Sequence, residues 1–375
     1  MIYLDNSATT APCAAAVQAV RKALEEDFGN PSSLHAAGIT AERAVRRARG
    51  DIAASLGVGE NEIFFTSGAT ESNNTALFGA VHNKRRAPGR IVTTAIEHPS
   101  VLRCMDALEK EGFEVVRVKP REGCVRAEDL DEAITPQTVL VSIMAVNNET
   151  GEILPVKAAA ESIRRKKAPA LLHCDAVQAY GKLPLYPARW GIDLMSISGH
   201  KLYGPKGIGA LYKRKGLNLP PLLLGGGQET GLRSGTENVP GIVGFGAAVQ
   251  DVFSQAAEFR EHLSALGSYA ERALGKIPGV VIQSPPGHAP YILNFSLPGI
   301  LSETVLHELE SFGIFVSAGS ACSAHAKGSH VLAAYGYPDA QIRSSVRVSL
   351  GRENTCEEID VLCDTLAHCI ERFLR

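Results

Sequence analysis

Short apolar runs rich in β-branched residues alternate with longer helix-compatible stretches between about residues 60 and 215. This rhythm predicts a mostly parallel, seven-stranded sheet covered by helices on both faces. The run Val139–Val146 is nearly continuously apolar, as in a central strand buried on both faces. The expected strands are Glu62–Thr66, Ile91–Thr94, Glu114–Val118, Val139–Val146, Ala170–His173, Leu194–Ser198 and Gly209–Tyr212.

The pattern changes after a long helical stretch that begins near Val239. The remaining residues predict a smaller α+β domain, with strands at Gly279–Gln283, Tyr291–Ser296 and near Ile314 and Val346, and helices over Ser302–Phe312 and from Thr355. No low-complexity linker or internal repeat is visible, so we expect the boundary inside the long helix. We divide the chain into a large domain, residues 1–255, whose N-terminal segment packs on the small domain, residues 256–375.

Composition narrows the possible functions. The 375 residues carry a formal net charge of −2 with both signs interspersed, so no basic field indicates a nucleic-acid partner. Asp5 interrupts any signal-peptide core, and no apolar run is long enough to span a bilayer, which predicts a cytoplasmic protein without membrane contact. Eight cysteines are too sparse for a disulfide scaffold, and none belongs to a Cys-x-x-Cys pair, so most should be reduced and structural.

The motif Ser67–Ser72 follows an expected strand and opens a helical segment. Its backbone amides and hydroxyls could hold a phosphate, because a helix N-terminus favours anions. An ordinary capped helix, with Ser67 or Thr70 as N-cap, is the alternative.

Two further motifs also come directly after expected strands. Asp175 could pair with a protonated pyridine nitrogen and keep it charged, which makes the ring an electron sink. A metal site with His173 and Cys174 is disfavoured, because alternate strand residues face opposite sides and no further ligand pattern is present. Lys201, in Ser196–Lys201, could reach a cofactor aldehyde, although a solvated surface lysine is the alternative.

In order and spacing, these motifs resemble those of the cysteine desulfurases, fold type I pyridoxal-phosphate enzymes of the NifS/IscS type. The resemblance covers almost the whole chain. The matching segments are Tyr3–Thr10, Gly29–Ser33, Ser67–Ser72, Glu97–His98, Val146–Gly151, Asp175–Gln178, Ser198–Lys201 and Arg233–Thr236.

The resemblance implies the residues that hold the cofactor ring. Lys201 would form the Schiff base with pyridoxal phosphate, and Asp175 would pair with the pyridinium nitrogen. Gln178 would hydrogen-bond the ring hydroxyl, and Asn148 would orient ring and substrate. His98 would lie over the ring and exchange protons during catalysis, although a histidine before a proline is often only a helix-start residue.

The resemblance also implies a phosphate site and a homodimer. Thr236 would reach the phosphate from a second subunit. The residues of the same subunit that would hold the phosphate are Ala69, Thr70, Ser198 and His200.

Cys322 separates a desulfurase from an aminotransferase, which has no use for a thiol there. It lies in Ser317–Gly328, a run of small residues that predicts a mobile, exposed loop. Desulfuration needs a second nucleophile that attacks the substrate sulfur. Only about 3% of an ordinary thiol is ionised at neutral pH, so Cys322 should need help from nearby positive charge or from a proton acceptor such as His98 or His325. In contrast, Cys356, Cys363 and Cys369 lie on an expected helix as small apolar side chains.

Arg347 is the expected partner of the substrate α-carboxylate. Alternation in Ser345–Ser349 puts it on the polar face of a strand, and the subsequent Leu350–Arg352 matches the family. A solvated arginine is the alternative.

The resemblance therefore implies conversion of L-cysteine to L-alanine, with a persulfide on Cys322 for an iron-sulfur scaffold or a tRNA thiolation enzyme. Ala11 departs from the usual threonine, which should be harmless, and the end at Arg375 lacks the C-terminal extension with which some members contact a scaffold. The alternatives are a class V aminotransferase or selenocysteine lyase with the same cofactor, and a sulfur carrier without turnover.

Overall fold

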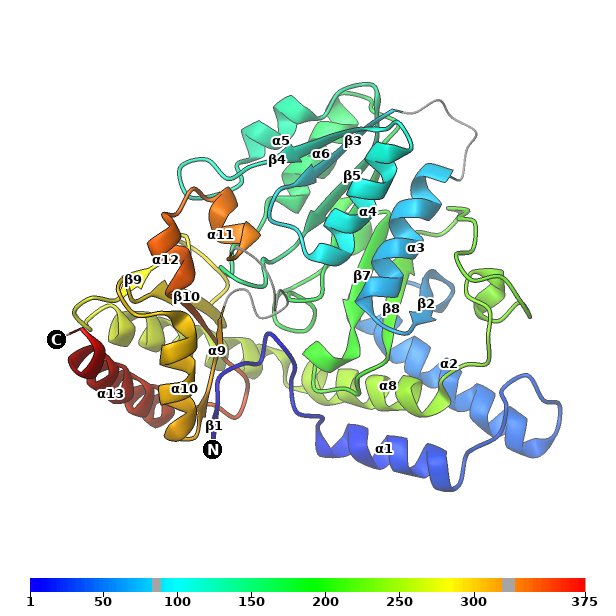
Figure 1. The fold of residues 1–375 in the computed structure, drawn as a ribbon. Helices are drawn as coiled ribbons and strands as arrows, with labels where there is room; N and C mark the ends of the chain where they lie inside the picture. Colours follow the sequence, from blue (N-terminus) through cyan, green and yellow to red (C-terminus); the bar gives the residue numbers. More distant parts are fainter. Residues whose placement is uncertain (83–88, 319–327, 375) are drawn as a thin grey trace.

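A seven-stranded sheet forms the centre of the larger domain in this computed structural model, which describes residues 1–82, 89–318 and 328–374 (Figure 1). All seven expected strands are confirmed to within two residues at each end. β6 runs on to Asp175, so this aspartate is the last residue of its strand. The strands are β2 (Ile63–Thr66), β3 (Arg90–Thr94), β4 (Glu114–Val118), β5 (Thr138–Met144), β6 (Leu171–Asp175), β7 (Leu194–Ser198) and β8 (Gly209–Lys213).

The order of the strands brings the motifs to one edge of the sheet. That order is β2-β8-β7-β6-β5-β3-β4, and β8 is antiparallel to both of its neighbours. The other six strands therefore run in one direction, and their carboxyl ends share one edge. Ligands of such sheets bind at this edge, where the segments after β2, β3, β5, β6 and β7 meet.

Helices cover both faces of this sheet, as predicted. Alternation along β5 shows the two faces: Leu140 packs in one apolar cluster with residues of α3 and α4, whereas Val141 and Ile143 pack in another with residues of α6. The helices of this part are α1 (Ala14–Glu25), α2 (Ala36–Leu56), α3 (Ala69–His82), α4 (Pro99–Lys110), α5 (Ala127–Ala133), α6 (Val156–Arg165), α7 (Pro187–Trp190) and α8 (Val239–Ser254), with short 3-10 turns η1 (Glu60–Glu62), η2 (Gly199–Lys201) and η3 (Glu229–Gly231).

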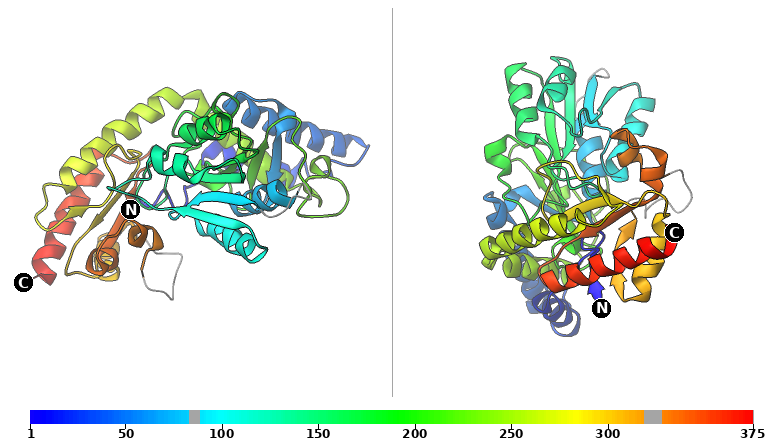
Figure 2. Two further views of the ribbon diagram at one scale, coloured as in Figure 1. Left: turned by 90° about the horizontal axis from the view of Figure 1, so that it is seen from above. Right: turned by 90° about the vertical axis from the view of Figure 1, so that its left-hand side faces the viewer.

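A smaller antiparallel sheet lies beside the large one (Figures 1 and 2). Its order is β12-β13-β10-β9, with strands β9 (Val281–Ile282), β10 (Ile292–Ser296), β12 (Ser317–Ala318) and β13 (Ser345–Ser349). The predicted α+β character is confirmed. The helices here are α9 (Ala256–Leu274), α10 (Ser302–Ser311), α11 (His330–Ala334), α12 (Asp339–Arg343) and α13 (Cys356–Phe373).

The long helix expected after Val239 is two helices. α8 ends at Ser254 and α9 begins at Ala256, and Gln255 between them has φ −127° and ψ 27°, outside the helical region. The prediction of an uninterrupted helix was wrong. The division of the chain at residue 255 stays a prediction, and the break falls at this residue.

The N-terminal segment connects the two sheets. β1 (Ile2–Tyr3) pairs in parallel with β11 (Ile314–Phe315). The Ser7 backbone N–H donates to Ser349 Oγ at 2.8 Å, and the Thr10 N–H donates to the His200 carbonyl at 2.9 Å. Residues 2–10 thus lead from β11 and β13 to the turn that carries Lys201.

The cysteines of the described ranges are not disulfide-bonded to one another. Cys104, Cys174 and Cys369 are buried, as expected of small apolar side chains, but Cys356, the first residue of α13, is exposed. Within the same ranges, no helix is long and apolar enough to cross a membrane.

Candidate active site

Lys201 lies at the strand-end edge, in the turn η2 that comes after β7. Its amine donates to the Ser7 carbonyl at 2.5 Å and to the Ala8 carbonyl at 2.6 Å. Backbone carbonyls of the N-terminal segment hold the amine, so Lys201 is not the solvated surface lysine of the alternative interpretation.

Asp175 and Gln178 lie beside Lys201. The Asp175 carboxylate is buried, and it accepts from the Asn73 amide at 2.8 Å and from the Val177 N–H at 3.1 Å. Gln178 Nε2 donates at 3.0 Å to the Ser7 carbonyl, the same oxygen that accepts from Lys201. This shared oxygen brings the ends of β6 and β7 into one site.

His173 is a structural residue. Its two ring nitrogens lie 2.8 Å from Ser142 Oγ and 3.1 Å from Ser196 Oγ, on the neighbouring strands. Burial lowers the pKa of His173 to about 4, so the ring is neutral. No cluster of three or more His, Cys, Asp or Glu residues in the described part of the chain could hold a metal ion.

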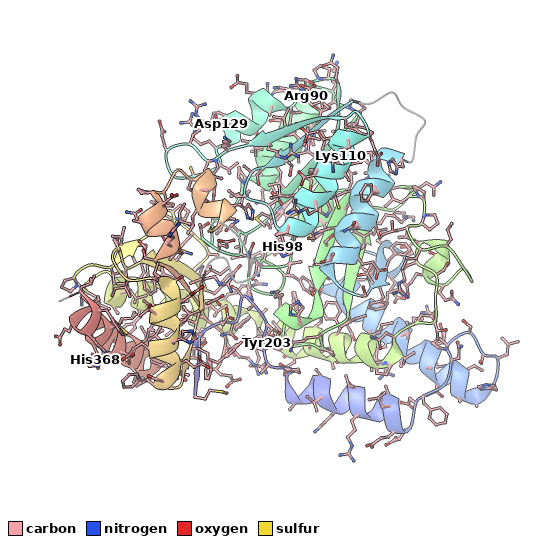
Figure 3. The ribbon with its side chains drawn as sticks, in the orientation of Figure 1. Arg90, His98, Lys110, Asp129, Tyr203 and His368 are labelled. Atoms are coloured by element: carbon pink, nitrogen blue, oxygen red, sulfur yellow. The ribbon has the colours of Figure 1, made fainter. Side chains whose placement is uncertain are left out.

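His98 caps the N-terminus of α4 with Nδ1, which accepts from the Ser100 N–H at 3.2 Å, and Pro99 takes the first helical position. The helix-start interpretation is therefore correct, and it leaves Nε2 for other partners. Burial lowers the pKa of His98, the charge of Asp175 raises it, and the charge of Lys201 lowers it. His98 is labelled in Figure 3, at the start of α4. The Asn73 amide, which donates to Asp175 and to Ser100, and the Ser100 hydroxyl, 2.8 Å from His98 Nδ1, connect this histidine with Asp175.

The expected phosphate residues lie where β2 and β7 end. α3 begins at Ala69, so Gly68, and neither Ser67 nor Thr70, takes the cap position. A Cβ on Gly209, the first residue of β8, would lie 2.8 Å from Gly68 Cα and 2.6 Å from the Ile197 carbonyl, so only glycine lets both segments approach β8 here. Gly209 pairs with Thr66 on one side and with Ser198 on the other, which brings the segment before α3 to the end of β7.

His200 completes this part of the site. Its Nδ1 lies 3.2 Å from Thr9 Oγ1. Burial, with the charges of Lys201, Lys206 and Lys182, lowers the pKa of His200 to about 4, so the ring is neutral and can donate one hydrogen to an anion.

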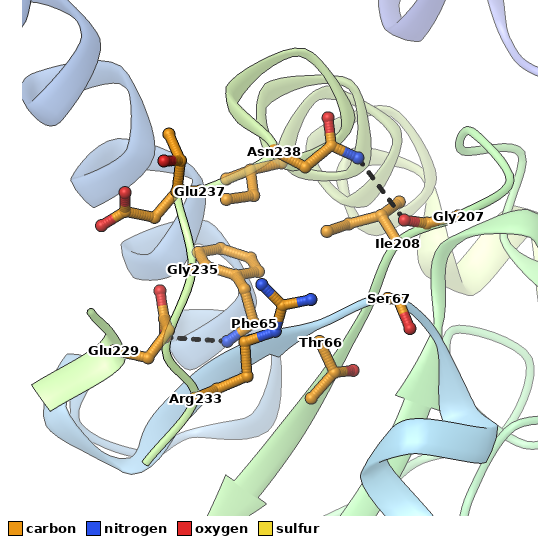
Figure 4. Close-up of a pocket in the computed structure, with 12 residues that line it drawn as sticks. Phe65, Thr66, Ser67, Gly207, Ile208, Glu229, Arg233, Gly235, Glu237 and Asn238 are labelled. Atoms are coloured by element: carbon orange, nitrogen blue, oxygen red, sulfur yellow. Dashed lines mark hydrogen bonds between the residues drawn. The ribbon is translucent and has the colours of Figure 1, made fainter. Parts of the chain in front are cut away.

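Thr236 is exposed and lines a cavity of about 170 Å³ beside the start of α3. Ser67 and Gly207 line this cavity too (Figure 4), whereas Lys201, Asp175 and His98 do not. Within one chain, the structure therefore brings Thr236 to the Ser67 side of the site but not to Lys201.

Two ion pairs hold the segment that carries Thr236. Arg49 bonds Glu229 at 2.7 Å, and Glu229 also accepts from the Phe65 N–H at 2.9 Å in β2. Arg233 bonds Glu71 in α3 at 3.0 Å. The segment is thereby fixed against β2 and α3, which border the expected phosphate site.

Arg347 is buried in β13. Its Nη1 donates to the Asn148 carbonyl at 2.8 Å, and its Nη2 pairs with Asp5 at 2.7 Å. All five residues Ser345–Ser349 are buried, so the expected polar face points into the protein and the solvated interpretation of Arg347 is wrong. Asn148 comes after β5 and thus lies at the same strand-end edge as Asp175.

Cys322 lies outside the described residues, but both flanks of its segment are anchored. In β12, Ser317 pairs with Arg347. Beyond the segment, Ser329 Oγ donates to Glu149 Oε2 at 2.5 Å, and burial raises the pKa of Glu149 to about 7. The flanks therefore lie beside Arg347 and beside the residue next to Asn148.

The sequence analysis included Glu97 and Asn147 in its matching segments but assigned them no role, and both support residues of the site. Glu97 is fully buried, and its Oε1 accepts from Thr94 Oγ1 at 2.7 Å and from the Met144 N–H at 2.9 Å. Asn147 Oδ1 accepts from the Glu149 N–H at 2.9 Å and so shapes the turn that presents Asn148. Their position directly before a site residue was the available signal.

The residues present fit pyridoxal phosphate. A buried carboxylate (Asp175) suits a pyridinium nitrogen, and Gln178 Oε1, buried and without a partner among the described residues, suits a ring hydroxyl. Lys201 supplies a primary amine at the same edge. The amides at the start of α3 suit a phosphate.

Comparison with known proteins agrees with this chemistry. The class-V aminotransferase profile matches residues 2–362. A cysteine desulfurase IscS of Clostridium botulinum is 41% identical over 99% of this chain and 94% of its own. A solved NifS-like protein is 38% identical, with TM-score 0.92 and 99% of both chains covered. A structure titled SspA in complex with cysteine is 34% identical, with TM-score 0.82, over 95% of this chain and all of its own. The chain therefore belongs to the class-V aminotransferase family of pyridoxal-phosphate enzymes, among the cysteine desulfurases.

Proposed function

We propose that this protein converts L-cysteine to L-alanine with pyridoxal phosphate and transfers the sulfur to Cys322. The observation that carries the proposal is the meeting of Lys201, Asp175 and His98 at one edge of the sheet. The relatives named cysteine desulfurase, and the similar structure solved with cysteine, support the choice of substrate.

The cofactor, when bound, supplies an electron sink that labilises bonds to the substrate α-carbon. Lys201 would hold it through its amine, and Asp175 would keep its ring nitrogen protonated, because the buried carboxylate favours a cation nearby. Gln178 and Asn148 would orient the ring, and His98 would exchange protons with the reacting atoms.

Arg347 binds the substrate α-carboxylate. Its bonds to Asp5 and to the Asn148 carbonyl fix the guanidinium plane, and its Nε is buried without a partner among the described residues. A fixed guanidinium gives up little conformational entropy when it takes a carboxylate, which favours two parallel hydrogen bonds.

The start of α3 would hold the phosphate. Thr236 reaches it from the second subunit of a homodimer, which accounts for its exposure and for the two ion pairs that fix its segment. The residues of the same subunit that hold the phosphate are Ala69, Thr70, Ser198 and His200.

The sulfur step is a thiolate attack. Cys322 attacks the sulfur of the bound substrate, so a sulfur–sulfur bond forms as the carbon–sulfur bond breaks and the electron pair returns to carbon. L-Cysteine and a thiol thereby become alanine and a persulfide without an external oxidant. A scaffold protein for iron-sulfur clusters or a tRNA thiolation enzyme then takes the sulfur, and the protein itself stays in the cytoplasm.

The test is incubation of the holoenzyme with L-cysteine without reductant, and then measurement of alanine and peptide mass mapping. We expect alanine with one extra sulfur on Cys322, loss of both in Cys322→Ser, and no change in Cys356→Ser, an exposed cysteine that serves as matched control. Lys201→Ala should lose the absorbance of the bound cofactor. Alanine without sulfur on Cys322 would indicate a lyase or aminotransferase, and no alanine would indicate a carrier.

A further inference from the structure

A chain of hydrogen bonds connects Asp175 with His98 through two residues that have no part in the proposed function. Asn73 Nδ2 lies 2.8 Å from Asp175 Oδ2 and 2.9 Å from Ser100 Oγ. Ser100 Oγ lies 2.8 Å from His98 Nδ1. Asn73 is fully buried and Ser100 is 9% exposed, so water does not compete for these bonds. The chain runs from β6 through α3 to the start of α4.

The direction of the first two bonds is set by the chemistry of their ends. The Asp175 carboxylate only accepts, so the Asn73 atom that faces it is the amide nitrogen. The second hydrogen of this nitrogen points to Ser100 Oγ, which accepts it. Asn73 Oδ1 is buried and has no partner among the described residues, so its two donated bonds alone fix the orientation of this amide.

The direction at His98 is set by its capping role. Nδ1 accepts from the Ser100 backbone N–H, so a hydrogen on Nδ1 would point at another hydrogen. Ser100 Oγ already accepts from Asn73, and its own hydrogen can point to the same Nδ1. In the neutral ring, the proton is therefore on Nε2.

We propose that Asn73 and Ser100 are positioning residues that hold His98 as the neutral tautomer with its hydrogen on Nε2 and tie the ring to Asp175. This inference rests on the proposed function, since both ends of the chain belong to that site. In this tautomer Nε2 carries a hydrogen, so it can donate a proton but has no lone pair with which to accept one. His98 therefore enters the reaction as a donor, and the first proton removal is left to Lys201.

The tautomer is measured directly by nitrogen NMR. The holoenzyme is labelled with ¹⁵N-histidine, and two-bond couplings to the ring carbon hydrogens show which nitrogen carries the proton. The His98 signals are those lost in His98→Gln. We expect the Nε2–H form of His98 at neutral pH before any cysteine is added. A proton on Nδ1, or on both nitrogens, would overturn the proposal, and neither result depends on turnover.

Variants test the two positioning residues. In Asn73→Ala and Ser100→Ala, we expect a mixture of His98 tautomers and a fall in kcat for alanine formation of at least about tenfold, with KM changed less than about twofold. Ser100→Thr keeps the hydroxyl and should restore the Nε2–H form. The matched control is Asn74→Ala, one residue along α3, whose amide donates to the Thr70 carbonyl of its own helix at 2.9 Å.

The outcomes separate this inference from the proposed function. An unchanged His98 tautomer in both alanine variants overturns the positioning role, whatever their activity. If Asn73→Ala does not fold, the comparison of Ser100→Ala with Ser100→Thr decides the question alone. A wild-type enzyme that shows the Nε2–H form but makes no alanine refutes the proposed function and leaves the positioning role supported.

Discussion

Glu97 should make the protein less stable as the pH rises, and replacing it with glutamine should remove this effect. Burial raises the pKa of Glu97 from 4.5 to about 8, opposed by the hydrogen bonds from the Met144 N–H and Thr94 and assisted by the charge of Asp175. The folded protein therefore keeps a proton on Glu97 that the unfolded chain has already released. Wherever the folded state binds more protons, stability falls with rising pH.

The size of the effect is set by the two pKa values. The contribution of Glu97 to the unfolding free energy is complete below about pH 4.5 and is lost as the pH rises from there to about 8. At 1.36 kcal/mol per pH unit, the loss amounts to roughly 3–5 kcal/mol. In Glu97→Gln the amide oxygen can still accept from the Met144 N–H and Thr94, but nothing titrates. The stability of the variant relative to wild type should therefore grow by that amount across this pH range.

The assay is urea denaturation of holoenzyme at several pH values, with the cofactor in equal excess throughout, because ligand binding also adds stability. A difference in unfolding free energy that is the same at every pH reports the replacement of the acid by the amide. Only the part of this difference that changes with pH reports the titration of Glu97. Glu261→Gln, at an exposed carboxylate on α9, is the control and should behave like wild type. If the stabilities of wild type and Glu97→Gln fall in parallel between about pH 5 and pH 8, the reasoning is refuted.

Three other substitutions test the contacts around the site. Gly209→Ala puts a Cβ within 2.6 Å of a carbonyl in β7, so we expect the unfolding free energy in urea to fall by about 1–3 kcal/mol. Cofactor uptake, measured by absorbance titration, should also be weaker, and wild-type values for both would contradict the close contact. Asp5→Asn removes the 2.7 Å ion pair of Arg347 and should raise KM for L-cysteine by about 3- to 10-fold, with a smaller change in kcat. An unchanged KM would argue against Arg347 as the partner of the substrate carboxylate. Arg49→Ala removes the guanidinium that pairs with Glu229, whose side chain is only 2% exposed, and should lower the unfolding free energy by about 3 kcal/mol. A loss under about 0.5 kcal/mol would show that the ion pair contributes little to stability.

The sequence was sufficient for the sheet because period and length distinguish short apolar strands from helices. It also identified Lys201 and Asp175 as residues at strand ends, where parallel sheets bind ligands. The break at Gln255 could not be predicted, because neither Pro nor Gly marks it. Nor could the reversed direction of β8, since a short apolar strand has the same pattern in either orientation.

The roles of Asn73 and Glu97 could not be predicted from the sequence for a different reason. Asn73 lies in the third helix, and a polar residue there is typical of a solvated face. Its partner Asp175 is 102 residues away, so only the packing of α3 across the sheet makes the contact. Glu97 resembles an ordinary charged residue until the burial of its whole segment is known.

The path of the N-terminal segment also sets an order of events during synthesis. Residues 2–10 are translated before all of their partners: Thr10 bonds the His200 carbonyl after β7, whereas β11 and Ser349 follow much later in the chain. The large sheet can form co-translationally, whereas the segment whose carbonyls hold Lys201 gains its contacts with β11 and β13 only after these strands have emerged. A nascent chain therefore carries the lysine before the segment that holds its amine has all of its contacts, and the surroundings of the reactive amine are finished only once β13 has been made.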